Sequence, residues 1–176
     1  VSVDISIVNV TSKTVKPLVQ WQGNDTNPIF SPNGKIIVFN SNGGKNEPIG
    51  LSDIYTIPSN GGKPTKLAET PNRSANIIKW SSNSNFVYVS DANRTKSEIY
   101  TISLKNTEAT SLLKLNGRIS SPAISKDSKK IVFVKQELDK PSELFLSELK
   151  KISLKKISNF NSDIKFPELT KTELIQ

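Results

Sequence analysis

A short motif that recurs at a nearly constant spacing is the strongest constraint on the fold of this chain. The motif is an acidic residue, an aliphatic residue and then alternating apolar and polar residues. It occurs four times, beginning at Asp4, Asp53, Glu98 and Glu143, with spacings of 49, 45 and 45 residues. A period in this range is typical of a fold built from repeated supersecondary units, and the alternation predicts a half-buried strand in each copy.

A second motif precedes the acidic one and consists of a serine, a turn and a strand. The matched serines are Ser31, Ser81 and Ser125, which are 50 and 44 residues apart. In the first copy the turn is Pro-Asn-Gly at residues 32–34, where proline presets one backbone angle and glycine permits a positive one. The apolar run at residues 36–39 then predicts a strand that is buried on both faces.

A third strand signal closes each repeat, at residues 65–67, 110–113 and 155–157. Each repeat therefore holds four short strands joined by polar connections, which is the pattern of a β-propeller blade. An antiparallel sandwich also has short strands and frequent turns, but it does not require the same acid and the same serine at a fixed period. We predict an all-β protein, a β-propeller of four-stranded antiparallel blades.

The chain is long enough for about three and a half blades of the size given by the repeat. The predicted divisions are residues 1–26 for the last strands of a preceding blade (at 4–8 and 15–19), 27–70, 71–115 and 116–161 for three blades, and 162–176 for a linker towards a possible downstream hydrolase domain. Closed propellers have roughly four to eight blades. Either a longer protein supplies further blades or a homodimer completes the ring. The absence of Met and the opening at Val1 predict that the chain is a segment of a longer protein.

The chain contains no histidine and no cysteine. A Ser-His-Asp relay, a histidine-ligated zinc site and a cysteine nucleophile therefore cannot be built from it. No glycine-rich phosphate loop or calcium loop motif occurs either. We predict that this chain alone is not an enzyme and that it has no catalytic, cofactor-binding or metal-binding residues.

The net charge is +8, with 21 Lys and only 3 Arg. The densest cluster is Lys150, Lys151, Lys155 and Lys156. It is either a patch for an anionic partner or a solvated outer strand whose lysines discourage edge-to-edge pairing, and we favour the second interpretation. Aromatic residues are not interleaved with these lysines as base stacking requires, so no nucleic-acid partner is predicted. No apolar run approaches the roughly 18 residues of a membrane span, so no membrane partner is predicted.

The recurring side chains are predicted to be architectural. Because Asp53, Glu98 and Glu143 occur once per repeat, we expect each to accept hydrogen bonds from backbone or hydroxyl donors near its strand, and the matched serines to cap their turns. Trp21 is expected to pack on the first full blade. Five further aromatic residues are expected to fill the space between blades: Phe30, Phe39, Trp80, Tyr88 and Phe133.

Three connections are the best places for a residue that faces a substrate or a partner, because binding residues are concentrated on loops. The longest is at residues 40–50 and is rich in Asn and Gly; the matching ones are at 91–96 and 136–141.

The blade motif resembles that of a known group of proteins. Residues 29–39, followed by Asp53-Ile54-Tyr55, are similar to the "W-S-P-D-G-K-x-I-A-F…D-I-Y" blade of TolB-like propellers and of the N-terminal propellers of prolyl oligopeptidase-type serine peptidases. The likeness spans nearly the whole chain, although residues 82–85 of the middle copy depart from Pro-Asp-Gly-Lys. The motif is specific for the blade and weak for function, since propellers are shared scaffolds.

The C-terminal sequence resembles the junction between propeller and α/β-hydrolase domain in acylaminoacyl- and dipeptidyl-peptidase relatives, at residues 156–161 and 171–175. The resemblance implies a non-catalytic propeller that gates or docks peptides for a hydrolase domain, and none of the family's catalytic residues can be assigned to this chain. The alternative is a TolB-like periplasmic propeller that acts as a protein-binding scaffold. The implied partners are thus a hydrolase domain, a peptide or another protein, and an extracytoplasmic location is favoured.

Overall fold

The computed structural model describes residues 2–45, 51–105 and 108–163, and within these ranges all regular structure is β-strand. The strands are β1 (Ile5–Val8), β2 (Val15–Val19), β3 (Thr26–Phe30), β4 (Ile36–Ser41), β5 (Asp53–Pro58), β6 (Thr65–Lys66), β7 (Asn76–Trp80), β8 (Phe86–Asn93), β9 (Lys96–Ser103), β10 (Ala109–Asn116), β11 (Arg118–Ile124), β12 (Lys130–Glu137), β13 (Lys140–Glu148) and β14 (Lys155–Lys156). The prediction of an all-β chain is confirmed.

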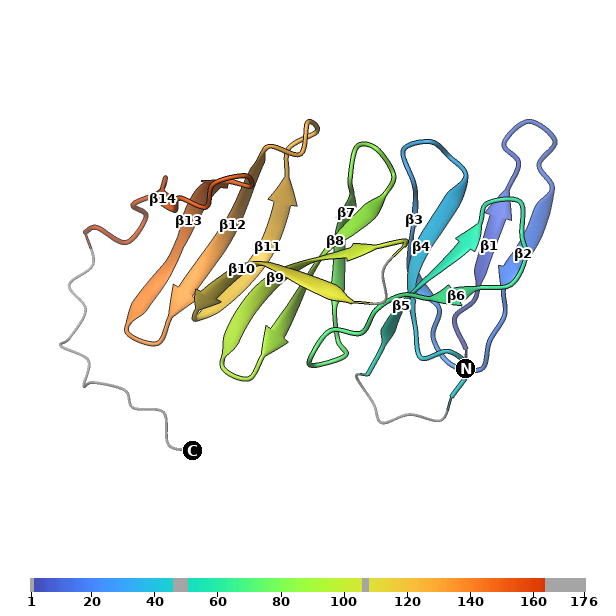
Figure 1. The fold of residues 1–176 in the computed structure, drawn as a ribbon, viewed down its shortest axis with the longest axis horizontal. Helices are drawn as coiled ribbons and strands as arrows, with labels where there is room; N and C mark the ends of the chain where they lie inside the picture. Colours follow the sequence, from blue (N-terminus) through green and yellow to red (C-terminus); the bar gives the residue numbers. More distant parts are fainter. Residues whose placement is uncertain (1, 46–50, 106–107, 164–176) are drawn as a thin grey trace.

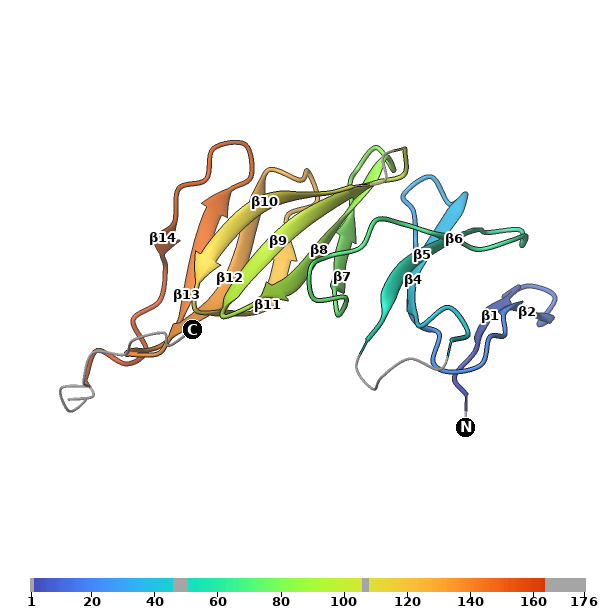
Figure 2. The same ribbon diagram turned by 60° about the horizontal axis from the view of Figure 1, so that its bottom comes forward.

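The strands form one two-stranded sheet, β1-β2, and three four-stranded sheets, β3 to β6, β7 to β10 and β11 to β14. In every sheet, strands that are consecutive in the chain are neighbours and run antiparallel. Figure 1 shows the four sheets side by side in chain order along the long axis, and Figure 2 shows them from a second direction. This is the predicted arrangement of about three and a half propeller blades.

The matched serines cap the turns between the first two strands of each four-stranded sheet, as predicted. Each hydroxyl accepts a hydrogen bond from the backbone amide five residues later. The pairs are Ser31 with Ile36 at 3.0 Å, Ser81 with Phe86 at 3.1 Å and Ser125 with Lys130 at 3.0 Å. Each turn contains one residue with a left-handed backbone, which is Gly34 (φ 70°) in the first turn, Ser84 (φ 62°) in the second and Ser128 (φ 56°) in the third. The middle copy therefore keeps the turn although it lacks the Pro-Asn-Gly sequence.

The core consists of apolar layers between adjacent sheets. One layer holds Val38 and Ile54 of the first full sheet against Val87, Val89 and Ile102 of the next. Because residues of a strand alternate between its two faces, neighbouring positions such as Tyr88 and Ile99 belong to the following layer, with Ile131 and Phe133. The first two full sheets thus have an apolar layer on each face, which explains the continuous apolar runs in β4 and β8.

Five of the six aromatic predictions are confirmed. Phe39, Trp80, Tyr88 and Phe133 are buried, and Trp21 packs edge-on against Tyr55 with ring centroids 5.1 Å apart.

The prediction that Phe30 fills the space between blades is wrong, because its side chain is 51% exposed. Trp80 has the same position in its repeat and is 2% exposed, since it packs with Val38 of β4 and Ile54 of β5 in the preceding sheet. The sheet that precedes Phe30 holds only β1 and β2 in the described chain, which match the third and fourth strands of a blade. Among the described residues, no strand equivalent to β4 covers the Phe30 ring.

Two predicted connections are mostly strand. β8 and β9 are separated only by residues 94–95, and β12 and β13 only by residues 138–139, so the expected connections at 91–96 and 136–141 are tight hairpins. The strands continue this far because backbone pairing extends to Asn93↔Lys96 and Glu137↔Lys140. In the connection at 40–50, β4 runs to Ser41, and residues 46–50 lie outside the described residues. Most of the predicted linker at 162–176 also lies outside them.

Candidate functional site

The repeated acids lie at one end of the sheets, together with the segments that lead from one sheet to the next. Asp53 begins β5, and Glu98 and Glu143 lie near the starts of β9 and β13. Parallel bridges join the start of the third strand of a blade to the segment that enters the next sheet, at Val3↔Asn24, Ser52↔Ser74 and Lys96↔Gly117. The hairpins β8-β9 and β12-β13 close at this same end, the lower edge of Figure 1. We call it the acid end.

Asp53 is buried in an ion-pair cluster. Its two carboxylate oxygens accept hydrogen bonds from Arg73 Nε at 3.2 Å and Arg73 Nη2 at 2.9 Å, and Lys66 Nζ lies 2.7 Å from Oδ2. Burial raises the pKa of Asp53, but the hydrogen bonds from Arg73 and Lys66 outweigh it and hold this pKa below its usual 3.8. Arg73 lies in the segment that joins β6 to β7, so Asp53 ties the first full sheet to the approach of the next. The donors are charged, whereas backbone or hydroxyl donors were predicted.

Replacing Asp53 with Asn should lower the free energy of unfolding by about 2 kcal/mol at pH 7, because a paired, buried charge is lost. A carboxyl whose folded-state pKa is depressed stabilises the fold above its unfolded pKa, and this contribution disappears as the pH falls through the folded pKa. The difference between wild type and Asp53→Asn should therefore shrink between pH 5 and pH 3, roughly one unit either side of the unfolded value. Urea unfolding at both pH values measures it.

The control for this prediction is Asp4→Asn. Asp4 begins the same motif in the first repeat but is exposed. Its substitution should change the stability by less than about 0.5 kcal/mol at either pH. Equal effects of the two substitutions would contradict a stabilising role of the Asp53 cluster.

Glu98 and Glu143 accept hydrogen bonds from hydroxyls, as predicted. Glu98 Oε2 accepts from Ser111 Oγ at 3.0 Å, and Glu98 Oε1 accepts from Asn93 Nδ2 at 2.8 Å. Burial raises the pKa of Glu98, but these hydrogen bonds bring it below its usual 4.5. Glu143 accepts from the Ser158 hydroxyl, which lowers the Glu143 pKa. Glu98 and Glu143 are thus both ionised, and each accepts hydrogen bonds from its own sheet or from the segment that follows that sheet.

The segments that lead into the three full sheets differ in length, and this difference opens a cavity. In the first full sheet, Trp21, from the segment between β2 and β3, covers Tyr55. In the second, Ala68 and Ala75, from the segment between β6 and β7, pack in one cluster with Tyr100. In the third, the segment between β10 and β11 is Gly117 alone. The residue in the matched position, Phe145, is only partly buried.

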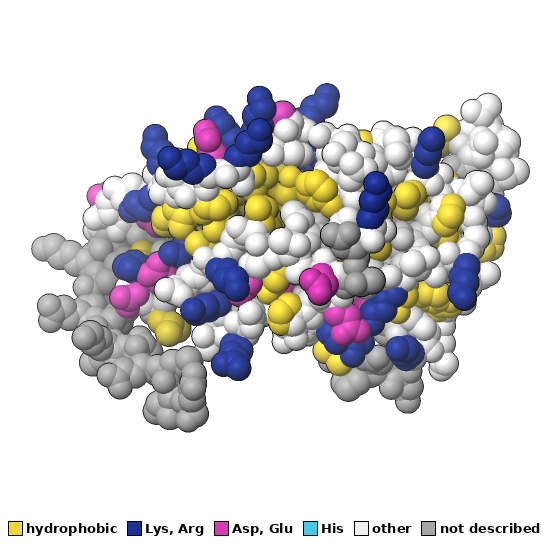
Figure 3. All heavy atoms as spheres, viewed as in Figure 1, with side chains coloured by type: hydrophobic (Ala, Val, Ile, Leu, Met, Phe, Trp, Pro, Cys, Tyr) yellow, Lys and Arg dark blue, Asp and Glu magenta, His cyan; other side chains and the backbone are white. Residues whose placement is uncertain are grey.

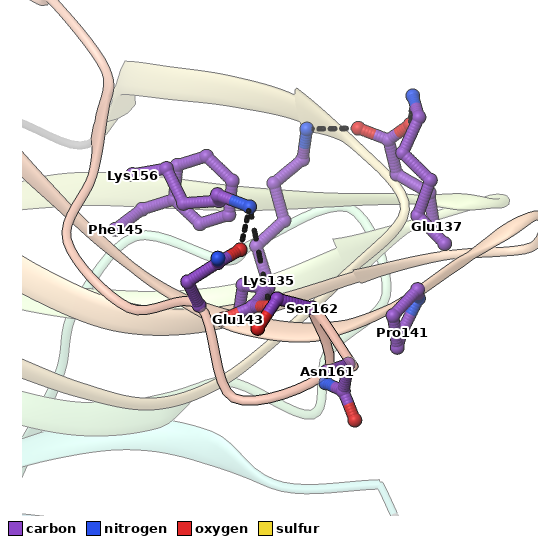
Figure 4. Close-up of a pocket in the computed structure, with 10 residues that line it drawn as sticks. Lys135, Glu137, Pro141, Glu143, Phe145, Lys156, Asn161 and Ser162 are labelled. Carbon is purple, nitrogen blue, oxygen red and sulfur yellow. Dashed lines mark hydrogen bonds and ion pairs between the residues drawn. The ribbon is translucent and has the colours of Figure 1, made fainter. Parts of the chain in front are cut away.

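The cavity beside Phe145 has a volume of about 320 Å³. It is lined by Lys135, Glu137, Lys140, Pro141, Glu143, Phe145, Lys156, Asn159, Asn161 and Ser162. Figure 4 shows these side chains arranged around the start of β13, with Lys135 directed at Glu137 and Lys156 next to Glu143. We call it the Phe145 cavity.

The charges around the Phe145 cavity are paired. The ammonium groups of Lys135 and Lys140 both contact Glu137, the second at 2.6 Å, and they hold the pKa of Glu137 below its usual value. Lys156 Nζ lies 4.0 Å from Glu143 and donates to Asn159 Oδ1 at 3.2 Å. The Lys135 ammonium also lies 5.5 Å from the centroid of the Phe145 ring.

Sequence reasoning placed Glu143, Lys156 and the connection at 136–141 separately and missed the cavity that brings them together. The connection contributes Glu137, Lys140 and Pro141 to the lining. A usable signal was present in the sequence. Aligning the repeats leaves little chain between the last strand of the second blade and the first strand of the third, so a connecting segment is missing there.

The lysine cluster is exposed, as the solvated-strand interpretation requires. Lys155 and Lys156 form β14, the edge strand of the last sheet, and Lys150 and Lys151 lie just before it. Figure 3 shows dark blue side chains gathered along the upper left edge of the molecule, over this sheet.

Residues 2–45, 51–105 and 108–163 contain no group of three His, Cys, Asp or Glu side chains placed to hold a metal ion. In the same ranges there is no helix with the length and apolar character needed to cross a membrane.

Comparison with known proteins places the chain among propellers. A family model described as the TolB beta propeller domain matches residues 2–169. No curated protein matches the chain.

Solved structures share the fold. TolB from Acinetobacter baumannii is 16% identical, with a TM-score of 0.67 over 87% of this chain and 37% of that one. An oligogalacturonate lyase in complex with manganese is 14% identical, with a TM-score of 0.74 over 94% and 44%. The β-propeller domain of the Trilobed protease from Pyrococcus furiosus is 18% identical, with a TM-score of 0.61 over 88% and 48%. At these identities the likeness shows the fold alone, and the chain spans less than half the length of each of the three structures.

Proposed function

The chain belongs to the TolB β-propeller domain family, and on that premise we propose that it is the non-catalytic propeller segment of a prolyl oligopeptidase-type serine peptidase. A scaffold role is supported by the way in which the repeated acids are bonded. Hydrogen-bond donors of the fold itself bind each of the three carboxylates, those of Asp53, Glu98 and Glu143. The motif that dominates the sequence therefore stabilises the sheets. The peptidase assignment is supported by the sequence at residues 156–161 and 171–175 and by likeness to a protease propeller.

The proposed mechanism is steric. The propeller would admit short peptides to a hydrolase domain and exclude larger ones, with the acid end and its hairpins as the docking surface. Because this mechanism is steric, no residue of this chain would transfer a proton to the substrate, and the catalytic groups would belong to the hydrolase domain. The partners under this proposal are a hydrolase domain and a peptide.

The second candidate is a TolB-like scaffold that binds another protein outside the cytoplasm. It is favoured by the family match and by the likeness to TolB, in which case the propeller itself would be the functional unit.

A homodimer that completes a ring is compatible with either candidate. β1 has only one hydrogen-bonded neighbour in the described chain, so its other edge is open to a strand of a second copy. A sedimentation mass that stays that of a monomer at all concentrations would contradict the dimer.

The test compares this chain with the protein that its gene encodes beyond Gln176. We expect no turnover of a chromogenic dipeptidyl substrate or of an acyl-peptide by residues 1–176 alone. We expect the longer protein to carry a G-x-S-x-G elbow followed by Asp and His, and to cleave short peptides but not folded proteins. A gene that stops, or that adds only further repeats, would contradict the peptidase proposal and favour the scaffold. Turnover by the isolated chain, above mock-purified controls, would contradict both.

A further inference from the structure

The Phe145 cavity exists because the third full sheet departs from a pattern that the first two share. Ser41, Asp91 and Lys135 have the same position, each paired across the sheet with the repeated acid. In the first sheet, Ser41 donates to Asp25 of the incoming segment at 2.5 Å. In the second, Asp91 accepts from Thr70 of the incoming segment at 2.5 Å. Such a segment fills this position in two sheets and is missing in the third.

Lys135 has a different role because the incoming segment is reduced to Gly117. Its ammonium group contacts Glu137 of its own hairpin and lies over the Phe145 ring. Its side chain is only 12% exposed, so the charge is held against an aromatic ring in a partly enclosed space. A cation beside a partly exposed aromatic ring that lines a cavity is an arrangement suited to ligands that carry both an apolar group and a negative charge.

The apolar part of the cavity is formed by Phe145 and Pro141. The Phe145 ring is stacked on Phe133, with centroids 6.3 Å apart, which fixes its orientation. Lys156 pairs with Phe145 in the β13-β14 ladder, so its side chain starts beside the ring. Figure 4 shows Lys156 alongside Phe145 at one side of the cavity. A volume of about 320 Å³ accommodates one aromatic or large aliphatic side chain.

The charged part of the cavity has an excess of cations. Three lysines and two glutamates line it, and both glutamates have depressed pKa values and are ionised at neutral pH. Among the three lysines, Lys156 has the longest ion pair, at 4.0 Å, and its side chain is 48% exposed. Lys156 is therefore the group best placed to take a further anion.

We propose that the Phe145 cavity binds a carboxylate that is attached to an aromatic or large aliphatic group, as at the C-terminus of a peptide or in an acidic side chain next to an apolar one. The apolar group lies on Phe145, and the carboxylate pairs with Lys156. This site does not depend on whether the protein is a peptidase propeller or a scaffold, because it concerns binding by residues 1–176 alone.

The test is a titration of the isotope-labelled full chain with N-acetyl-phenylalanine, followed by amide chemical shifts. We expect the amide chemical shifts to change at the C-terminal end of β12, at the start of β13 and at β14. N-acetyl-phenylalanine amide, which lacks the carboxylate, should bind about fivefold more weakly. An acetylated Asp-Phe amide carries only a side-chain carboxylate and therefore distinguishes the two sources of the anion. If it binds as tightly as N-acetyl-phenylalanine, the site accepts side-chain carboxylates as well as C-termini. If it binds more weakly, the site is specific for C-termini.

Two variants separate the parts of the site. Lys156→Gln should weaken N-acetyl-phenylalanine about fivefold and leave the amide unchanged, while Phe145→Leu should weaken both ligands. The matched control is Lys129→Gln, a 73% exposed lysine of the same sheet in the turn between β11 and β12, at its opposite end. Equal affinity for the acid and the amide, an equal effect of Lys129→Gln and Lys156→Gln, or shifts spread over other sheets would each overturn the proposal.

Discussion

Trp80→Ala should lower the free energy of unfolding by about 4 kcal/mol, the cost of removing a fully buried tryptophan. Trp80 is 2% exposed and packs between the first and second full sheets with Val38 and Ile54. Its Nε1 also donates a hydrogen bond to the carbonyl oxygen of Ile29 at 3.0 Å, which ties β7 to β3 of the preceding sheet. Truncation leaves a cavity between the sheets and an unpaired carbonyl. Urea unfolding followed by far-UV circular dichroism measures the loss.

The matched control is Phe30→Ala, because Phe30 has the same repeat position in the preceding sheet. Its ring is 51% exposed, so truncation removes little buried surface and should cost less than about 1 kcal/mol. A contrast of this size between equivalent positions would show that the layers between sheets, and not the repeat motif itself, stabilise the fold. If the two substitutions had equal effects, this account of the core would be wrong.

Gly117→Ala should lower the free energy of unfolding by about 3 kcal/mol. A Cβ atom at position 117 would lie 2.2 Å from the carbonyl oxygen of Gln136, which is backbone and cannot rotate away. The backbone at Gly117 also has a φ of 85°, which side-chain-bearing residues rarely adopt. Only glycine allows a single residue to join β10 to β11 while the start of β9 bridges to it.

Gly34→Ala is the control for this prediction. Gly34 has a φ of 70°, but a Cβ atom there would meet nothing within 4 Å. Its substitution should cost only about 1 kcal/mol, the conformational part of the effect. The difference between the two variants, measured by urea unfolding, isolates the steric contact with Gln136. A cost at position 117 no larger than that at position 34 would show that β12 moves aside and that the connection is not tight.

The local features of this fold could be predicted from the sequence because the interactions that create them are short in range. Ser31 caps its turn through an amide five residues away, and the same contact recurs at Ser81 and Ser125. The alternation of apolar residues places each strand, and the period of the acids places each sheet. Even the middle turn, which lacks the usual residues, adopts the same backbone, because Ser81 makes the same hydrogen bonds as Ser31.

Contacts between repeats could not be predicted in the same way. Asp53 pairs with Arg73 of the segment that leads into the next sheet, and the repeat offers no counterpart to this arginine at Glu98 or Glu143. Phe30 and Trp80 are equivalent in the motif, and only the number of strands in the preceding sheet decides which of them is buried.

The strands, the turns, the four-stranded repeat and the hydroxyl donors of Glu98 and Glu143 follow from the sequence alone, because each depends on neighbours within one blade. The tertiary structure decided where a cavity lies, because that depends on how one sheet meets the next. Phe145 has the position of Tyr55 and Tyr100, yet it lies beside a cavity because a single glycine replaces the segment that would cover it. The space left between two packed sheets depends on the length of the segment that connects them. The residues of the repeated motif carry no information about that length.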